Sequence, residues 1–339
     1  MRFGLIGYGL WGRHHAAAIA KAPGADLAAI ACASEATAAA ALRDFPGVRV
    51  DIGYQSLLAR REIDAVAIVV PNHLHADIGV AALAAGKDVL LEKPMAITAA
   101  ECDRLLAAAG RSRRVLSIGH ELRVSVQWSA IKAMLDAGEI GEPLYALVTL
   151  FRYPYRPGAG GWRYAAERVG SWILEEPVHF FDLIMWYFES LGDPTSVLAV
   201  GNSKGREAGM SDNFSTIVRF PRGVYAVITQ TLAGFEHHNV VEIVGTEGAI
   251  RTWWSATTAR TLEPTHELKV QRRGATACEM LKIGVSGELF ELAEEIRQTA
   301  VAFGERRPLV SGVEARKRVV VCLEAERSLR EGRELSLQF

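Results

Sequence analysis

The chain has 339 residues, of which half are hydrophobic and 23% are charged, and its formal net charge at pH 7 is -1. This length predicts two domains, because a single hydrophobic core seldom extends beyond about 250 to 300 residues. The near-neutral charge provides no basic surface for nucleic acid or anionic lipid, which favours a small-molecule partner.

The first 120 residues alternate short apolar runs with alanine-rich helical patterns. We expect strands at 3–6, 27–32, 65–70, 88–91 and 115–119, and helices at about 12–22, 35–43, 54–59, 75–85 and 99–109. This alternation is typical of a parallel sheet with crossover helices, so residues 1–121 are predicted to form a doubly wound α/β domain.

Beyond a helix expected at 126–137, the pattern becomes β-rich. Strands are predicted at 144–151, 196–200, 214–219, 224–230, 240–244 and 248–252, followed by helices at 288–303 and 312–331. The hairpin spacing indicates an antiparallel sheet. Residues 122–339 are therefore predicted to form an α+β domain, with the amphipathic last helix packed on a sheet or at the domain seam.

A glycine-rich turn follows the first predicted strand and opens the first helix. It reads Gly7-Tyr8-Gly9-Leu10-Trp11-Gly12, inside a βαβ unit of about 30 residues. Gly7 would permit a tight turn, Gly9 would let backbone approach a pyrophosphate, and Gly12 would bring helix close to strand. The turn predicts a nicotinamide dinucleotide site, against the alternative of a glycine turn that binds nothing.

The position where such sites hold the adenosine ribose is unusual. An acidic residue is expected about 20 residues beyond the turn, but Cys32 stands there, followed by Ala33, Ser34 and Glu35. No arginine or lysine is at hand for a 2′-phosphate. This favours NAD slightly over NADP, with Cys32 interpreted as a small buried residue at the strand end.

Glu92-Lys93-Pro94 directly follows the strand expected at 88–91. Ligands of open α/β sheets sit at the carboxyl ends of strands, which places Lys93 near the cofactor. A lysine there can hydrogen-bond a substrate hydroxyl and help move its proton. The alternative is an ordinary solvated surface lysine.

Several motifs together resemble the Gfo/Idh/MocA oxidoreductases over nearly the whole chain. They are the glycine turn with His15, Pro71-Asn72-His73-Leu74-His75, the segment from Ala84 to Pro94, and Gly138-Glu139-Ile140-Gly141-Glu142-Pro143. The resemblance implies a Rossmann domain and an open-faced antiparallel sheet domain, bound NAD or NADP, and oxidation or reduction of sugars, inositols and related polyols. It also implies oligomers through the exposed sheet face, here a homodimer or homotetramer.

The segment from Gly170 to Asp182 resembles the second signature of that family, Asp-x-Gly-x-His-x-x-Asp. His179 and Asp182 match, whereas Glu175 replaces the first aspartate and Pro177 replaces the glycine. Proline favours a first helical turn, which puts His179 and Asp182 on one helix face. We predict His179 as general base or acid, Lys93 as the group that polarises the substrate oxygen, and Glu175 as a group that binds a neighbouring hydroxyl or tunes the lysine. The alternative for His179 is a packed core histidine.

Further residues are candidates for binding by the same resemblance. Pro71, Asn72 and His75 match a loop that lies against the cofactor, although Asn72 or His75 could instead cap the following helix. His15 is interpreted as structural. Contacts to cofactor or substrate are predicted for Glu92, Pro94, Trp162 and Arg163, and contacts to substrate for Arg123 and Tyr153. A salt bridge at the domain seam would explain Arg123 equally well. A subunit contact would explain Tyr153 and the rest of 152–157 nearly as well as stacking on a sugar ring.

The four cysteines show no C-x-x-C spacing, which predicts neither a metal site nor a disulfide framework and favours a reducing, cytoplasmic compartment. No apolar run reaches the roughly 18 to 20 residues of a membrane helix. Three functions stay open: a sugar or inositol dehydrogenase, a glycoside-cleaving enzyme that recycles its cofactor, and a non-catalytic dinucleotide sensor.

Overall fold

The computed structural model describes residues 1–203, 210–232, 234 and 236–339. They form two compact units that share two long helices, α10 (Glu288–Gly304) and α11 (Gly312–Glu331). Unit 1 comprises Met1–Glu121, Glu167–Gly170 and Leu292–Val319. Unit 2 comprises Leu122–Ala166, Ser171–Glu291 and Val320–Phe339.

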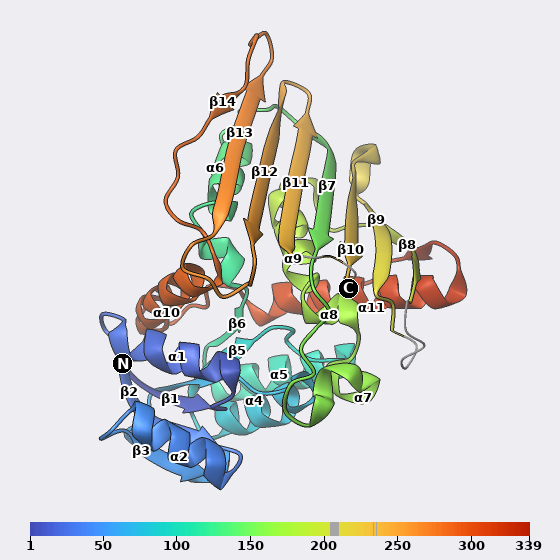
Figure 1. The fold of residues 1–339 in the computed structure, drawn as a ribbon. Coiled ribbons are helices and arrows are strands. Elements are labelled where there is room, and N and C mark those ends of the chain that lie inside the picture. The colour runs from blue at the N-terminus through green and yellow to red at the C-terminus, as the bar shows by residue number, and fades with distance from the viewer. Residues whose placement is uncertain (204–209, 233, 235) are drawn as a thin grey trace. The chain divides into compact units, whose positions relative to one another are not determined.

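Unit 1 is built on a six-stranded parallel sheet with the order β3-β2-β1-β4-β5-β6 (Figure 1). Its strands are β1 (Arg2–Ile6), β2 (Asp26–Cys32), β3 (Arg49–Ile52), β4 (Ala65–Ile68), β5 (Asp88–Glu92) and β6 (Leu116–Gly119). The main helices between them are α1 (Leu10–Lys21), α2 (Glu35–Asp44), α3 (Tyr54–Leu58), α4 (His75–Ala84) and α5 (Ala99–Ser112). The predicted doubly wound fold is confirmed, with one strand, β3, that the sequence analysis did not anticipate.

The core of unit 1 explains why β4 and β5 read as continuous apolar runs, because every residue of both strands is buried. Helix α10 returns from the far end of the chain to complete this core. Its Phe303 ring stacks on Phe3 of β1 with 6.4 Å between ring centroids.

Unit 2 contains a nine-stranded sheet with the order β14-β13-β12-β11-β7-β10-β9-β8-β15. Its longer strands are β7 (Pro143–Phe151), β8 (Ser196–Asn202), β9 (Asn213–Arg219), β10 (Tyr225–Thr231), β11 (His237–Gly245), β12 (Gly248–Ala256) and β13 (Thr265–Arg272). The short ones are β14 (Glu279–Met280) and β15 (Leu335–Ser336). The expectation of an antiparallel sheet needs one correction: β7 and β10 pair in parallel, since the intervening helices and hairpin bring β10 alongside β7 in the same direction.

The main helices that lie wholly in unit 2 are α6 (Trp128–Asp136), α8 (Trp172–Glu175) and α9 (Val178–Tyr187). Helix α7 (Ala166–Val169) belongs to unit 1 except for its first residue. In Figure 1, α6 and α9 lie behind the strands. Alternate residues of β7 and β10 are buried, as expected for strands that pack on helices through one face only. No helix among the described residues has the length and the apolar character that a membrane span requires.

Candidate active site

The glycine turn of unit 1 leaves open backbone at the start of α1. A side chain at Gly7 or Gly12 would bring a Cβ atom within 2.1 Å of a main-chain oxygen, of Val69 and Gly7 respectively. A Cβ at Gly9 would meet nothing within 4 Å. The turn is thus closed by its two outer glycines and open at the middle one, above the helix N-terminus, where a pyrophosphate would fit.

The residues that are predicted to lie near the adenosine part of the cofactor are buried or bonded to residues of α2. The Ser34 hydroxyl caps α2 by accepting a hydrogen bond from the Thr37 amide at 3.3 Å. Burial raises the pKa of the Cys32 thiol, so this cysteine is kept protonated. The Tyr8 hydroxyl donates to Asp44 at 2.8 Å, which directs the tyrosine side chain toward the end of α2.

Glu92, the last residue of β5, joins three segments of unit 1. Its Oε1 lies 2.7 Å from Trp11 Nε1 and 2.7 Å from His15 Nε2, while Oε2 accepts a bond from the Lys93 amide at 3.2 Å. Burial alone would raise the pKa of Glu92, but the His15 and Trp11 bonds and the charges of His15 and Lys93 lower it to about 2. Burial of Glu295, followed by the negative charge of Glu92, raises the pKa of Glu295 well above its usual range. One buried carboxylate therefore ties the glycine turn to the lysine segment.

Lys93 itself is half-buried. The segment after it is held by His75, whose Nδ1 lies 2.7 Å from the Pro94 carbonyl oxygen and whose Nε2 lies 2.9 Å from that of Val70. Asn72 donates to the Val169 carbonyl at 3.0 Å. The loops after β4 and β5 are thus fixed to each other beside Lys93.

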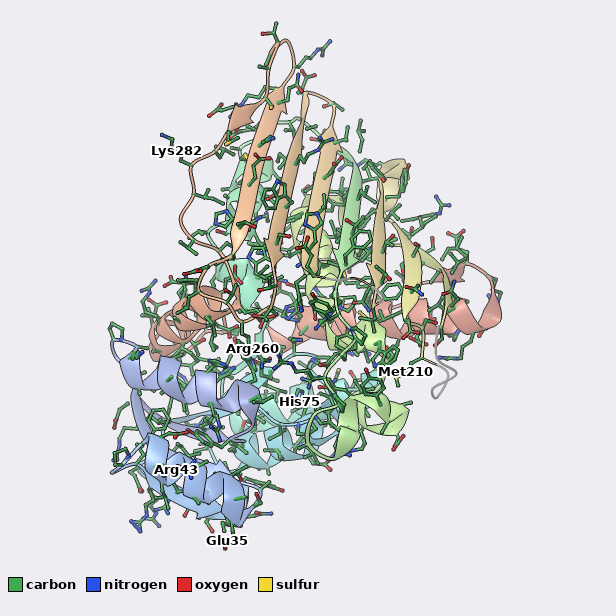
Figure 2. All side chains as sticks on the ribbon, viewed as in Figure 1. Glu35, Arg43, His75, Met210, Arg260 and Lys282 are labelled. Carbon is green, nitrogen blue, oxygen red and sulfur yellow. The ribbon has the colours of Figure 1, made fainter. Side chains whose placement is uncertain are left out.

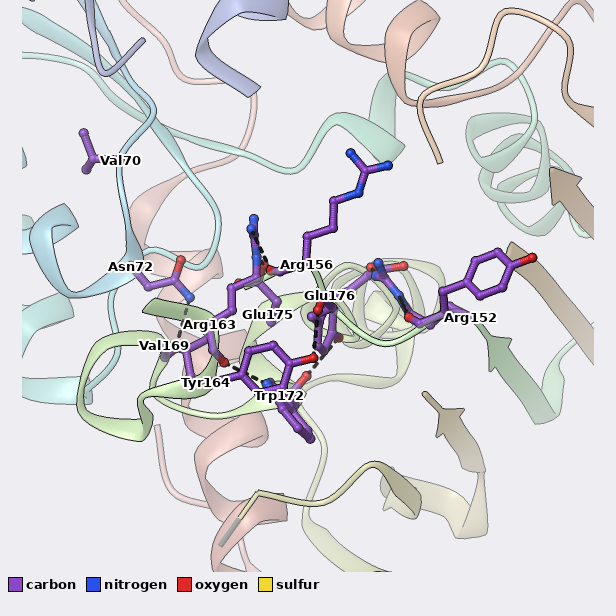
Figure 3. A network of polar contacts seen from close by, with 12 residues as sticks. Val70, Asn72, Arg152, Arg156, Arg163, Tyr164, Val169, Trp172, Glu175 and Glu176 are labelled. Carbon is purple, nitrogen blue, oxygen red and sulfur yellow. Dashed lines mark hydrogen bonds and ion pairs between the residues drawn. The ribbon is translucent and has the colours of Figure 1, made fainter. Parts of the chain in front are cut away.

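In unit 2, Glu175 and Arg163 form an ion pair, with 2.5 Å between Arg163 Nε and Glu175 Oε1 (Figure 3). The Arg163 guanidinium also lies over the Trp162 ring, 4.4 Å from its centroid. Glu175 is the last residue of α8, whose first turn is capped by the Ser171 hydroxyl. The structure therefore brings three predicted site residues together in one network.

His179 lies in the first turn of α9 and is buried. Asp182, one turn further on, accepts two bonds from Arg123, at 2.8 and 2.6 Å, and both side chains are almost fully buried. Arg123 is held in this salt bridge within unit 2 and also lies over the Trp186 ring. This pairing fixes the N-terminal part of α9, and with it the position of His179 in unit 2.

The loop before Arg163 contributes a second ion pair, between Arg152 and Glu176. The Tyr153 ring is exposed and lies edge-on to the ring of His237, at 6.0 Å between centroids. Tyr155 is buried and bonded through its hydroxyl to Gln230 at 3.2 Å. Its main-chain oxygen accepts from the Tyr164 hydroxyl at 2.8 Å, which anchors the loop.

Two family models match this chain. The one described as "Oxidoreductase family, NAD-binding Rossmann fold" matches residues 1–120, and the "GFO/IDH/MocA C-terminal domain" matches residues 128–251. An inositol 2-dehydrogenase from Acidothermus cellulolyticus is 31% identical over 255 residues, which cover 74% of this chain and 72% of that protein. The chain belongs to the Gfo/Idh/MocA family of oxidoreductases.

Other relatives of this Gfo/Idh/MocA protein differ in their named substrates. A 1,5-anhydro-D-fructose reductase from Ensifer adhaerens is 31% identical over 253 residues, covering 74% of each chain. A levoglucosan dehydrogenase solved with NADH and levoglucosan has a TM-score of 0.84 at 23% identity, covering 99% of both chains. An aldose-aldose oxidoreductase from Caulobacter crescentus has the same TM-score at 20% identity and the same coverage. The fold is thus common to enzymes with different sugar substrates.

Two sets of contacts made by the candidate site residues have no counterpart in the sequence predictions. The first is the buried set around Glu92, because His15 is 77 residues away and only the fold brings the two together. The second is His237, at the start of β11, which no motif marks. Its only sequence signal is its position beside a second histidine, His238.

Proposed function

We propose that this oxidoreductase transfers a hydride between NAD and a secondary alcohol or ketone of a sugar, inositol or sugar derivative. The observation that carries the proposal is the open space at Gly9 in the glycine turn. Glu92 connects this turn to the Lys93 segment, because it accepts hydrogen bonds from Trp11 and from the Lys93 amide. The names of the relatives, an inositol dehydrogenase and an anhydrofructose reductase, support the class of substrate.

The proposed roles follow from the chemistry of each side chain. Gly7, Gly9 and Gly12 would hold the pyrophosphate at the helix N-terminus, and the bound nicotinamide supplies the hydride acceptor or donor. Lys93 donates a hydrogen bond to the substrate oxygen and polarises it. His179 takes the hydroxyl proton during oxidation and returns it during reduction, while Arg163 orients Glu175 toward a neighbouring hydroxyl.

We propose NAD rather than NADP as the preferred cofactor. The residues at the end of β2 are Cys32, Ala33 and Ser34, none of which carries a positive charge. A 2′-phosphate would need such a charge or a fork of donors, which an arginine provides.

The experiment incubates the pure protein with NAD or NADP and a panel of inositols, aldoses, uronates and glycosides, following cofactor reduction and sugar products together. Reduction of NAD matched by a keto product supports the proposal. Glycoside cleavage without net reduction would instead indicate a recycled cofactor, and binding without turnover on the whole panel would indicate a sensor.

We further propose that the protein works in the cytoplasm as a homodimer or homotetramer through the open face of the unit 2 sheet. That face carries half-exposed apolar side chains from four neighbouring strands, namely Tyr145, Leu147, Ile217, Val227 and Val240. Apolar patches of this kind are typical of subunit interfaces. Light scattering of the pure protein tests this, and a monomer at all concentrations would contradict it.

A further inference from the structure

Three arginines of one loop region have different surroundings in unit 2. Arg152 pairs with Glu176 and Arg163 pairs with Glu175, two neighbouring carboxylates (Figure 3). Each of these arginines also lies 4.4 Å from the centroid of an aromatic ring, that of Tyr155 for Arg152 and that of Trp162 for Arg163. Both are therefore held in place by an opposite charge and a ring.

Arg156 lies between them in the sequence and has neither kind of support. Its side chain is exposed, and across the ranges that the structure describes it forms no ion pair or ring contact. Figure 3 shows it extended away from the two ion pairs. Its main-chain oxygen accepts a bond from Arg163 Nη1 at 3.5 Å, so its backbone belongs to the network that holds Glu175.

The pKa of the nearby His237 reflects the positive charges of this region. Burial, followed by the charges of Arg152 and Arg156, lowers the pKa of His237 to about 4, so the imidazole is neutral at pH 7. Arg152 and Arg163 are each paired with a carboxylate, so that among these five groups the positive charge of Arg156 is left unpaired. This charge resides on the exposed Arg156, where an anionic ligand would meet little desolvation cost.

We propose that Arg156 binds the carboxylate of a sugar acid, so that the preferred substrates of this enzyme are uronates or related polyhydroxy acids. The proposal rests on the proposed function, because it names the substrate class of the same site. The exposed Tyr153 ring, three residues before Arg156, offers an apolar face for the sugar ring. A single positive charge matches a carboxylate better than a phosphate ester, which carries about 1.5 to 2 negative charges at pH 7.

The test compares matched pairs of substrates that differ only in the acid group. D-glucuronate and D-galacturonate are assayed against D-glucose and D-galactose, with D-glucose 6-phosphate as a second anion. We expect kcat/KM for a uronate to exceed that of its aldose at least tenfold. In Arg156→Gln the uronate-to-aldose ratio should fall at least tenfold, and Arg156→Lys, which keeps the charge without the fork, should retain part of it.

The control is Arg43→Gln, which removes an exposed arginine from α2 in unit 1 (Figure 2) and should leave the ratio unchanged. An unchanged ratio in Arg156→Gln, or a preference for the phosphate ester, would overturn the inference while leaving the dehydrogenase assignment intact. Absence of cofactor reduction with every compound would overturn both. Calorimetric titration of D-glucuronate into wild type and Arg156→Gln checks the same contact without turnover, and equal affinities would refute it.

Discussion

At the scale of single residues, the proposed chemistry depends on one imidazole. His179 is buried on α9, and the Arg123–Asp182 salt bridge fixes the same stretch of that helix. Replacing His179 with Ala should lower kcat on the order of 10²-fold or more, because the hydroxyl proton then lacks an acceptor. Steady-state kinetics measure this, and NAD affinity should stay within about threefold because the glycine turn is untouched. Turnover near the wild-type level would remove His179 from the mechanism.

A second histidine should determine part of the acid sensitivity. The folded-state pKa of His237 is about 4, whereas an unfolded histidine has a pKa near 6.5, so between these pH values the unfolded chain binds more protons. The free energy of unfolding therefore falls as pH decreases from 6.5 to 4. In His237→Gln this fall should be smaller by about 1 to 2 kcal/mol, since partial exposure screens the full effect.

Urea unfolding of both proteins at pH 7, 5.5 and 4 checks this. Half-buried His238, the next residue of β11, supplies the matched control for replacing a histidine at this place, and His238→Gln should follow the wild-type curve. Parallel curves for wild type and His237→Gln would contradict the prediction.

At the scale of elements, the turn between β1 and α1 allows fold and binding to be tested separately. A Cβ at Gly9 meets no protein atom, and its φ of -81° suits any residue. Gly9→Ala should thus change the free energy of unfolding by about 1 kcal/mol or less, yet weaken NAD binding at least tenfold by occupying the space of the pyrophosphate. Gly12→Ala should destabilise the protein instead, because its Cβ would lie 2.1 Å from the Gly7 oxygen.

Urea unfolding and NAD titration of the two variants measure both properties. If Gly9→Ala binds NAD as tightly as the wild type, the pyrophosphate does not lie at this turn. If Gly12→Ala is as stable as the wild type, the close packing of α1 on the turn is not required.

Glu92 connects elements that are distant in the sequence, and its removal should be costly. Glu92→Ala leaves the donors of buried His15 and half-buried Trp11 without their acceptor, which should cost about 3 kcal/mol of unfolding free energy. Glu92→Gln keeps an acceptor oxygen and should cost less. Chemical denaturation measures both, with Glu35→Ala on the exposed start of α2 as control (Figure 2). A loss in Glu92→Ala no larger than in the control would show that the three segments are held independently.

The elements also show what could be predicted from sequence. The strands β1, β2, β4 and β5 were predictable because local apolar runs mark strands buried on both faces. The edge strand β3 was missed because only half of its residues are partly buried and it carries Arg49 and Asp51. The parallel pairing of β7 with β10 depends on tertiary packing between residues that are 80 positions apart in the sequence, which no local pattern encodes.

In the candidate site, too, some residues are marked by a local sequence pattern, whereas others are brought together only by the tertiary fold. The glycine turn and Lys93 could be found because each follows a strand within a few residues. The pairs Arg163–Glu175 and Arg123–Asp182 depend on how unit 2 folds, as does the meeting of Glu92 with His15 in unit 1. Local sequence patterns therefore mark the candidate residues more readily than the partners that hold them in place.

At the scale of the whole molecule, cofactor preference should appear as a difference in thermal stability. A ligand that binds only the folded state at 100 times its Kd adds about 2.7 kcal/mol to the free energy of unfolding. For a chain of this size that corresponds to a rise in Tm of roughly 4 °C. NAD should produce this rise, and NADP at equal concentration should produce less than half of it, because Cys32, Ala33 and Ser34 provide no charge for the 2′-phosphate. Differential scanning fluorimetry of wild type and Gly9→Ala makes the measurement, and the glycine variant should lose the NAD-dependent rise. An equal or larger rise with NADP would reverse the cofactor assignment, and a rise that persists in Gly9→Ala would place the dinucleotide away from the glycine turn.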